Sequence, residues 1–358
     1  MNGHQFLELK AELLVEGIQA TPEALEEVGK KYKEQNHGLF GWDFEDHADM
    51  LLPDDFVLPN GTVVQFRKNS RSLYQITRNG GPLVLSKDCR EICEVNWIPR
   101  PAYYNGKTTE GHTMVKIGQI GGEDCLFFCY QNYCSHFSKN EECLFCNLVS
   151  TSDTYRSVLK RKDKEDVGEV AKAAFEEGSV RHVLLTGGCF NHQKEIDLVS
   201  DILKSIREHT GLDRVPGTIL PYPAKGEDGI QKYYDNGIKA IRFRMEIWDE
   251  KLYRAICPGK AKDVAHDTFL RSIETAVQIF GAGNVFAVFV MGLEPRGTFL
   301  EGVRTIAGIG ANIVPFVWSP NPGSSLEGHR APASRWFVDT ILEASEIVYE
   351  AKVPPGTE

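Results

Sequence analysis

The sequence has no long apolar run and no concentration of basic residues. Its apolar stretches are far shorter than the roughly 20 residues of a membrane-spanning helix. Glu8 and Lys10 interrupt the apolar residues of the N-terminus, which therefore lacks the core of a signal peptide. The formal charge is −10 and no run of Lys or Arg stands out, which argues against a nucleic-acid groove and an anionic membrane surface. We expect neither nucleic acid nor a membrane as a partner.

A disulfide framework, internal repeats and low-complexity segments are also missing. The nine cysteines are an odd number, and a chain of 358 residues buries a core without covalent cross-links. We therefore expect the cysteines to be reduced, as they are in the cytoplasm. Reduced cysteines are available as metal ligands, so their spacing carries information.

Three cysteines, Cys134, Cys143 and Cys146, follow directly after an apolar, strand-like stretch at 126–130. Three thiolates at a strand end can hold a [4Fe-4S] cluster. Three protein ligands leave one iron free to bind and activate a small molecule, whereas four would close the site. The motif, written C-x8-C-x2-C, therefore indicates catalysis rather than plain electron transfer.

Zinc is the alternative metal for these residues. Cys143 and Cys146 form a common zinc half-site, and Cys134 with His136 could supply a second pair. Structural zinc sites usually place their ligand pairs about 12 to 20 residues apart, and these two pairs are closer. The spacing favours the cluster over zinc.

The cysteine motif resembles that of the radical S-adenosylmethionine (radical SAM) superfamily, in which three cluster cysteines lie in the loop after the first strand of a partial barrel. Phe145, just before the last cysteine, fits the aromatic position of that motif. The gap of eight residues between Cys134 and Cys143 departs from the usual three. The resemblance implies a [4Fe-4S] cluster and S-adenosyl-L-methionine as cofactors, with Cys134, Cys143 and Cys146 as catalytic metal ligands and Phe145 beside the cofactor.

The rest of the chain alternates strand-like and helical patterns, as a barrel requires. Together with the stretch before the cysteines, strands are predicted at 126–130, 182–186, 217–221, 240–245, 285–291 and 312–318. Helical patterns cover 194–209, 226–236, 261–280, 299–309 and 334–351. These six β/α units predict an α/β fold, a partial (β/α)6 TIM-like barrel over residues 116–358, with functional groups at the carboxyl ends of the strands.

Residues 1–115 predict a separate N-terminal α+β extension. The first 35 residues are charged and amphipathic and predict helix, with Thr21 as a cap and Pro22 at a first helical position. Strand-like runs follow at 62–66 and 72–76. We expect this extension to cap the barrel or to line the substrate entrance.

One predicted strand end carries a glycine-rich motif. Thr186, Gly187 and Gly188 match the motif that in radical SAM proteins contacts the amino group of the methionine moiety, with Cys189 where an acidic residue often follows. The resemblance thus assigns the three residues to the cofactor. A turn before a helix is the simpler interpretation of a Gly-Gly pair.

Later strand ends carry charged residues and another glycine. Arg244 and Glu246 fall on one face of a strand, and the run from Glu246 resembles the biotin-synthase-like branch. The resemblance implies that Glu246 accepts hydrogen bonds from the ribose and that Arg244 clamps the carboxylate of S-adenosylmethionine. A surface salt bridge between the two is the alternative. Gly292 and Glu294 resemble the late strand motif whose backbone packs beside the adenine.

The loop after the last predicted strand supplies substrate candidates. Its Pro, Gly and Ser residues predict a shaped loop at the barrel mouth. The candidates are Trp318, Asn321, His329 and Arg330. A single His or Arg in a loop is more often solvated than functional.

The resemblance implies a radical reaction on a small-molecule substrate in a biosynthetic step. A one-electron reductant such as flavodoxin or ferredoxin reduces the cluster, S-adenosylmethionine is cleaved to a 5'-deoxyadenosyl radical, and the radical abstracts hydrogen from the substrate. The oxygen sensitivity of such a cluster again implies the cytoplasm. Two alternatives remain: a sulfur-inserting (lipoyl- or biotin-synthase-like) or C–C bond-forming radical SAM enzyme with an auxiliary cluster, and a non-enzymatic metal-binding barrel protein. The predicted strands at 217–221 and 285–291 contain no cysteine, so a second cluster like that of biotin synthase is not expected there.

Overall fold

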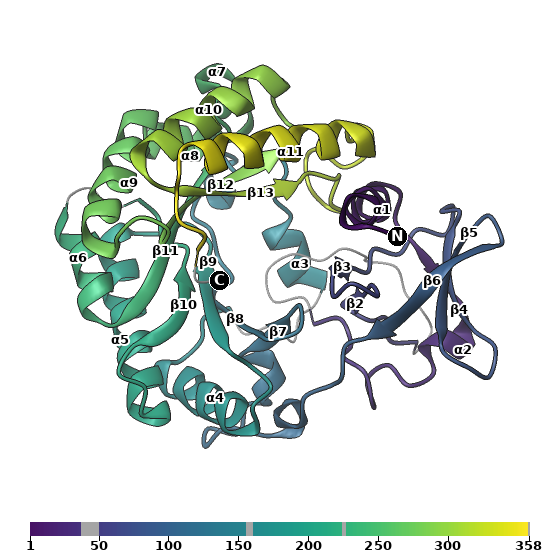
Figure 1. The fold of residues 1–358 in the computed structure, drawn as a ribbon. Coiled ribbons are helices and arrows are strands. Elements are labelled where there is room, and N and C mark those ends of the chain that lie inside the picture. Colours follow the sequence, from purple (N-terminus) through teal and green to yellow (C-terminus); the bar gives the residue numbers. More distant parts are fainter. Residues whose placement is uncertain (37–49, 155–159, 224–226, 357–358) are drawn as a thin grey trace.

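Two β-sheets organise the computed structural model, which describes all residues except 37–49, 155–159, 224–226 and 357–358 (Figure 1). The larger sheet holds seven strands, and their order in space is their order in the chain. They are β7 (Gln119–Gly121), β8 (Cys125–Gln131), β9 (His182–Gly187), β10 (Val215–Ile219), β11 (Ile238–Glu246), β12 (Val285–Met291) and β13 (Asn312–Val317). Neighbours from β8 to β13 are parallel, and β7 is antiparallel to β8.

Helices cover the outer face of this sheet, which curls into part of a barrel (Figure 1). The helices between and after its strands include α4 (Lys164–Glu177), α5 (His192–Thr210), α6 (Glu227–Asp235), α9 (His266–Phe280), α10 (Arg296–Ile309) and α11 (Ser334–Glu350). Crossovers between parallel strands are right-handed, which places the connecting helices on one face. The predicted α/β fold with a partial barrel is confirmed, and each predicted barrel strand is present within two residues of its predicted bounds.

One predicted helix, at 261–280, is in fact two. α8 (Pro258–Asp263) ends where Val264 and Ala265 adopt extended backbone, and α9 begins after them. A further short helix, α7 (Glu250–Ile256), precedes α8. Val264 is buried, so its side chain continues the apolar pattern of the helix and hides the break in the sequence.

The barrel core explains why its strands are recognisable in the sequence. Every residue of β12 is buried, and Phe289 of this strand packs edge to face against Phe299 of α10, with ring centroids 5.6 Å apart. Strands that are covered on both faces are apolar throughout rather than alternating. Such runs are therefore visible without any knowledge of their partners.

A second, six-stranded sheet forms what we call the N-terminal unit, the described residues up to Trp97. Its strand order is β1-β4-β5-β6-β2-β3. The strands are β1 (Gln19–Ala20), β2 (Asp55–Val57), β3 (Val63–Gln65), β4 (Tyr74–Arg78), β5 (Leu83–Lys87) and β6 (Arg90–Trp97). Trp97 packs against the rings of Phe56 and Phe66 in a core separate from that of the barrel. The strands predicted at 62–66 and 72–76 are present as β3 and β4, whereas β5 and β6 lie outside the predicted strands.

The prediction of helix through residue 35 is wrong. α1 (Gly3–Glu16) ends at Gly17, and α2 (Pro22–Leu25) is a single turn with Thr21 at its N-cap. Between the two helices, β1 pairs with β4. Gly17 has a φ of 70°, and a Cβ there would lie 2.9 Å from the carbonyl oxygen of Arg67. The chain therefore leaves the helix at Gly17 to follow the sheet.

Lys33 joins the N-terminal unit to the barrel sheet. Its buried ammonium donates to Asp55 Oδ2 at 3.0 Å and to the carbonyl oxygens of Ile120 and Gly122 at 2.7 and 3.0 Å. The helical turns η1 (Ala102–Asn105) and η2 (Met114–Lys116) connect the two units, and a domain boundary at residue 115 stays a prediction.

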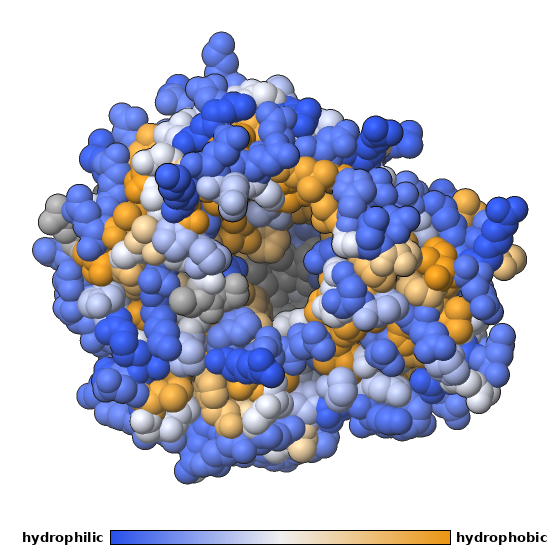
Figure 2. Space-filling model, viewed as in Figure 1, coloured by the Kyte–Doolittle hydropathy of each residue, from blue (hydrophilic) through white to orange (hydrophobic). Residues whose placement is uncertain are grey.

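One face of the molecule is hollowed at its centre, between the barrel and the N-terminal unit (Figure 2). α1 of the N-terminal unit lies beside α11 of the barrel at the rim of this hollow (Figure 1). The N-terminal unit therefore forms one wall of the hollow.

No helix in the described part of the chain has the length and apolar character that crossing a membrane requires.

Candidate functional site

Among the described residues, five cysteines gather where the barrel strands end. Cys134, Cys143 and Cys146 lie in the loop after β8, Cys189 follows β9, and Cys257 lies between α7 and α8. The sulfurs of Cys134 and Cys189 lie within 4.8 Å of each other, and the thiols of Cys143 and Cys257 are close enough to interact electrostatically. Burial, and then the neighbouring Cys143, raise the pKa of the Cys146 thiol. The structure thus brings the three predicted cluster ligands together and adds two further thiols.

Distant segments hold the cysteine loop from two sides. The loop passes through η3 (Phe137–Lys139) before it enters α3 (Leu148–Thr154). In between, Leu144 N donates to the carbonyl oxygen of Ile256 at 2.8 Å, and Leu326 N donates to that of Leu144 at 3.1 Å. These backbone hydrogen bonds fix the segment between Cys143 and Cys146.

Gly188 lets the loop after β9 approach the cysteine loop. A Cβ at this position would lie 2.1 Å from the carbonyl oxygen of Tyr133 and 2.9 Å from Cβ of Cys134. Gly187 leaves similar space for the ring of Tyr130, and Thr186 is buried beside it. Gly187 and Gly188 therefore allow the loop after β9 to pack closely against the loop after β8. Contact of Thr186, Gly187 and Gly188 with the methionine moiety stays a prediction.

Arg244 is half-buried near the end of β11, and two of its guanidinium donors are buried without partners among the described residues. Its Nη1 donates to the carbonyl oxygen of Gly187. Its Nε and Nη2 have no hydrogen-bond partner in the described part of the chain. Buried donors that stay unpaired cost free energy, so this arrangement points to an anionic ligand. A carboxylate, which the sequence assigned to Arg244, would satisfy both donors.

Glu195 of α5 is a buried acid beside Arg244 that the sequence did not reveal. Its Oε1 accepts from Tyr130 Oη at 2.8 Å, and its Oε2 accepts from Tyr222 N at 2.9 Å. Burial raises the pKa of Glu195 to about 7, and Arg244 opposes the rise by favouring the charged form. In the sequence Glu195 looks like any charged residue of an amphipathic helix.

Glu246 is paired with Lys260, which the sequence also did not identify. The Lys260 ammonium lies 2.5 Å from Glu246 Oε1 and 3.4 Å from the carbonyl oxygen of Arg244. Both side chains of this pair are buried, so the alternative of a surface salt bridge between Arg244 and Glu246 is wrong. Glu246 has a φ of 67°, a conformation that non-glycine residues adopt only where their surroundings enforce it.

Gly292 and Glu294 shape the loop after β12. Gly292 has a φ of 109°, and a Cβ there would lie 3.0 Å from the ring of Phe337. The Glu294 carboxylate accepts the backbone N–H groups of Trp248 and Asp249, both at 2.9 Å. Glu294 therefore ties this loop to the loop after β11. The adenine contacts of Gly292 and Glu294 stay predictions.

The substrate candidates lie in the loop after β13. Trp318 is 6% exposed, and its indole Nε1 has no partner among the residues that the structure describes. Asn321 accepts from Arg67 Nη2 and donates to the carbonyl oxygen of Phe145, both at 3.4 Å, so it links the N-terminal unit to the cysteine loop. Their substrate contacts stay predictions, as do those of the exposed His329 and Arg330.

The donor set suits an iron-sulfur cluster that binds an amino-acid ligand. Three thiols supply the ligands that a cluster with one open iron needs. The cations of Arg244 and Lys260 lie close enough to the thiols to interact with them electrostatically. They would offset the negative charge of thiolate ligands, which burial otherwise disfavours.

Sequence comparison finds two curated relatives, and no protein-family model matches the chain. The chain is 27% identical over 266 residues to bacteriochlorophyllide c C-7(1)-hydroxylase of Chlorobaculum limnaeum, covering 69% of this chain and 65% of the relative. It is 27% identical over 125 residues to biotin synthase of Brachyspira hyodysenteriae, covering 35% of this chain and 36% of the relative. The chain thus spans less than two thirds of the length of either relative.

Solved structures that align with this chain come from several enzymes. Methylornithine synthase aligns with a TM-score of 0.47 at 18% identity, over 63% of this chain and 62% of its own. The hydrogenase maturase HydG of Carboxydothermus hydrogenoformans aligns with a TM-score of 0.46 at 18% identity, over 64% of this chain and 51% of its own. Coproporphyrinogen III oxidase of Escherichia coli, a radical SAM enzyme, aligns with a TM-score of 0.45 at 14% identity, over 64% of this chain and 53% of its own.

Gly188→Ala tests the fit of the two loops. The added Cβ would collide with the backbone of Tyr133, so we expect the cysteine loop to shift and the iron bound per chain after anaerobic reconstitution to fall at least about fivefold. Gly308→Ala, on α10 with open space around it, is the control and should load iron normally. Normal iron loading by Gly188→Ala would contradict this fit.

Proposed function

We propose that this chain, a radical SAM enzyme, cleaves S-adenosylmethionine reductively at a [4Fe-4S] cluster held by Cys134, Cys143 and Cys146. The observation that carries the proposal is that these thiols gather at the same strand ends as Arg244, whose buried Nε and Nη2 lack partners among the described residues. When bound, the cluster and S-adenosylmethionine supply the electron transfer and the 5'-deoxyadenosyl radical chemistry. The chain supplies ligands, binding groups and a site that excludes water.

In this proposal Arg244 binds the carboxylate of S-adenosylmethionine. Its Nη1 is already held by the Gly187 carbonyl, which orients Nε and Nη2 toward the ligand. Glu195 is close enough to the guanidinium to interact with it electrostatically and is itself fixed by Tyr130 and Tyr222. A charged group whose rotamer is held by buried neighbours binds without a further entropic cost.

Glu246 accepts hydrogen bonds from the ribose hydroxyls. Lys260 holds its carboxylate in place, because the pair is buried and the two groups lie 2.5 Å apart. Oε1 is engaged by Lys260, and Oε2 is the oxygen that the ribose would use. Lys260 is therefore a positioning residue in this proposal.

The substrate is a small molecule that reaches the strand ends through the central hollow (Figure 2). Trp318 offers a buried indole N–H at the end of β13 as a donor to substrate. Asn321 and Arg67 extend this wall toward the N-terminal unit. We place the enzyme in the cytoplasm, because such a cluster is sensitive to oxygen. Flavodoxin or ferredoxin would supply the electron that reduces the cluster.

Hydroxylation of a tetrapyrrole is a second, narrower candidate. The relative that matches 69% of this chain is named for hydroxylation of bacteriochlorophyllide c. If the candidate is right, reconstituted enzyme will convert bacteriochlorophyllide c to a product whose mass reports one added oxygen atom. Unchanged pigment, in a reaction that still forms 5'-deoxyadenosine, would exclude this substrate and leave the broader proposal standing.

Cys143→Ala tests the assignment of the cluster ligands. Reconstituted wild-type protein should hold about four irons per chain, and loss of a ligand should abolish 5'-deoxyadenosine formation in the presence of S-adenosylmethionine and a reductant. Cys129→Ala removes a buried thiol from β8 that is not one of the three ligands, and it should retain both iron and cleavage. Undiminished cleavage by Cys143→Ala would refute the assignment.

Glu195→Gln tests whether Glu195 positions Arg244. The amide keeps the size of the side chain but removes one acceptor oxygen and the negative charge that Glu195 carries above its pKa of about 7, so above about pH 8 the dissociation constant for S-adenosylmethionine should rise about 10-fold, or about 1.4 kcal/mol. Equilibrium dialysis against the reconstituted protein measures it. Glu208→Gln, on an exposed turn of the same helix, should leave the constant unchanged. Equal constants for the two variants would show that Glu195 has no such role.

A further inference from the structure

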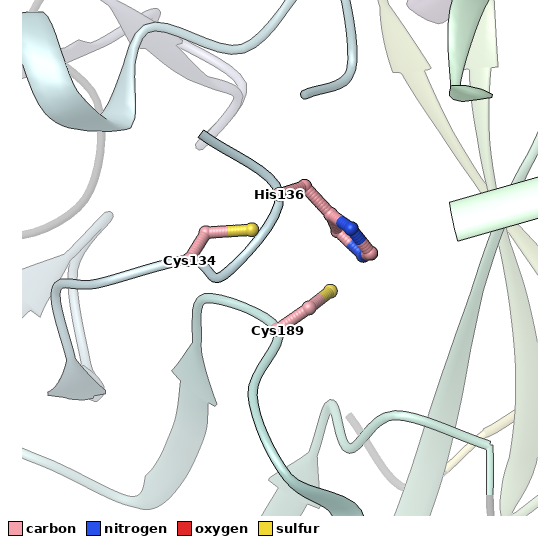
Figure 3. A group of neighbouring side chains, drawn as sticks. All are labelled: Cys134, His136 and Cys189. Carbon is pink, nitrogen blue, oxygen red and sulfur yellow. The ribbon is translucent and has the colours of Figure 1, made fainter. Parts of the chain in front are cut away.

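Three buried side chains, one of them the predicted cluster ligand Cys134, form a compact group. The ligand atoms of Cys134, His136 and Cys189 all lie within 4.8 Å of one another. Both thiols point toward the imidazole, one from the loop after β8 and the other from the loop after β9 (Figure 3). Two thiols and an imidazole are a donor set typical of Zn²⁺ and related divalent ions.

The spacing of these atoms suits a single ion. With metal–sulfur bonds of about 2.3 Å and metal–nitrogen bonds of about 2.0 Å, tetrahedral ligand atoms lie roughly 3.3 to 3.8 Å apart. The sulfurs of Cys134 and Cys189 lie within 4.8 Å of each other, so a small approach of the two loops would bring them to this spacing. A cubane cluster would hold its cysteine sulfurs farther apart, because each sulfur binds a different iron. Cys134 and Cys189 are therefore placed for one shared ion.

His136 is buried next to the two thiols, and its Nε2 also lies 3.8 Å from Asp263 Oδ2. Its side chain is 2% exposed, its Nδ1 has no hydrogen-bond partner in the described part of the chain, and its Nε2 lies 3.4 Å from Tyr222 Oη. The ring fits where it does because residue 259 is glycine: a Cβ there would lie 2.4 Å from Nδ1. A buried imidazole with so little hydrogen bonding has a ring nitrogen available for a metal.

We propose that the protein, before it receives its cluster, binds one divalent transition-metal ion of the Zn²⁺ class through Cys134, His136 and Cys189, with water in the fourth position. The two thiols release their protons as the ion binds. Because Cys134 serves both metals, the ion and the cluster exclude each other. The ion therefore holds the two loops together in the cluster-free protein and must leave before the cluster is assembled.

This site does not need Cys143, which separates it from the proposed catalytic cluster. Cys143 interacts electrostatically with Cys257 and is not one of the three residues. A Cys143→Ala protein should therefore keep the ion while it loses the cluster. Loss of Cys189 should weaken binding of the ion, and it leaves the three cluster ligands in place.

The test is an anaerobic titration of cluster-free, reduced protein with Co²⁺, which reports thiolate ligands by charge-transfer absorption and tetrahedral geometry by strong visible bands. Wild-type protein should bind one Co²⁺ per chain, displaceable by Zn²⁺, and zinc-loaded protein should not take up iron until a chelator is added. Cys189→Ala should weaken Co²⁺ binding at least about 10-fold. Cys129→Ala and Cys143→Ala should bind Co²⁺ as the wild type does.

His136→Gln is the second variant and should also lose the tetrahedral bands; circular dichroism verifies that each variant is folded. Equal Co²⁺ binding by folded wild type, Cys189→Ala and His136→Gln would overturn the inference, and so would loss of binding in Cys143→Ala. Wild-type protein that binds Co²⁺ but assembles no cluster would refute only the proposed catalytic function. Protein that assembles the cluster but binds no Co²⁺ would refute only this ion site.

Discussion

The site depends on the close approach of two loops at Gly188. The carbonyl of Tyr133 lies where a side chain at Gly188 would begin, and Ser135 N donates to the carbonyl of Cys189 at 2.8 Å. This contact brings Cys134 beside Cys189 at the ends of β8 and β9. Because parallel strands present their carboxyl ends at one edge, the ends of β11, β12 and β13 then complete the same site. A side chain at position 188 would separate the cysteines from the residues that bind the cofactor in our proposal.

Buried charged side chains are the second constraint, and each of them is held in position by a neighbouring polar or charged group. Arg244 lies beside Glu195, Glu246 is paired with Lys260, and Glu195 is held by two hydrogen bonds. Burying a charge costs several kcal/mol unless partners compensate, so a fold rarely keeps four of them together for stability alone. The unpaired donors of Arg244 are the part of this network that remains for a ligand. This is why the site is better suited to a charged cofactor such as S-adenosylmethionine than to an apolar ligand.

The sequence predicted those features that leave a local pattern. Barrel strands such as β12 are apolar throughout, and the cysteine motif lies within a short segment, so both are visible in the printed chain. The roles of Lys260 and Glu195 depend on contacts between segments far apart in sequence, which no local pattern records. The N-terminal helix was predicted too long because of another such contact. Pairing of β1 with β4 ends the helix, although the sequence stays amphipathic beyond that point. Cys189 reads as a packing cysteine until the fold places it against Cys134.

The most direct test of the account is the electron paramagnetic resonance spectrum of the reduced, reconstituted protein, recorded with and without S-adenosylmethionine. Three cysteine ligands leave one iron open, so the account predicts a [4Fe-4S] signal that changes when S-adenosylmethionine binds. In Arg244→Ala, which removes the group assigned to its carboxylate, the same change should need far more S-adenosylmethionine. A cluster signal that S-adenosylmethionine leaves untouched, or the absence of any cluster after reconstitution, would contradict the central claim.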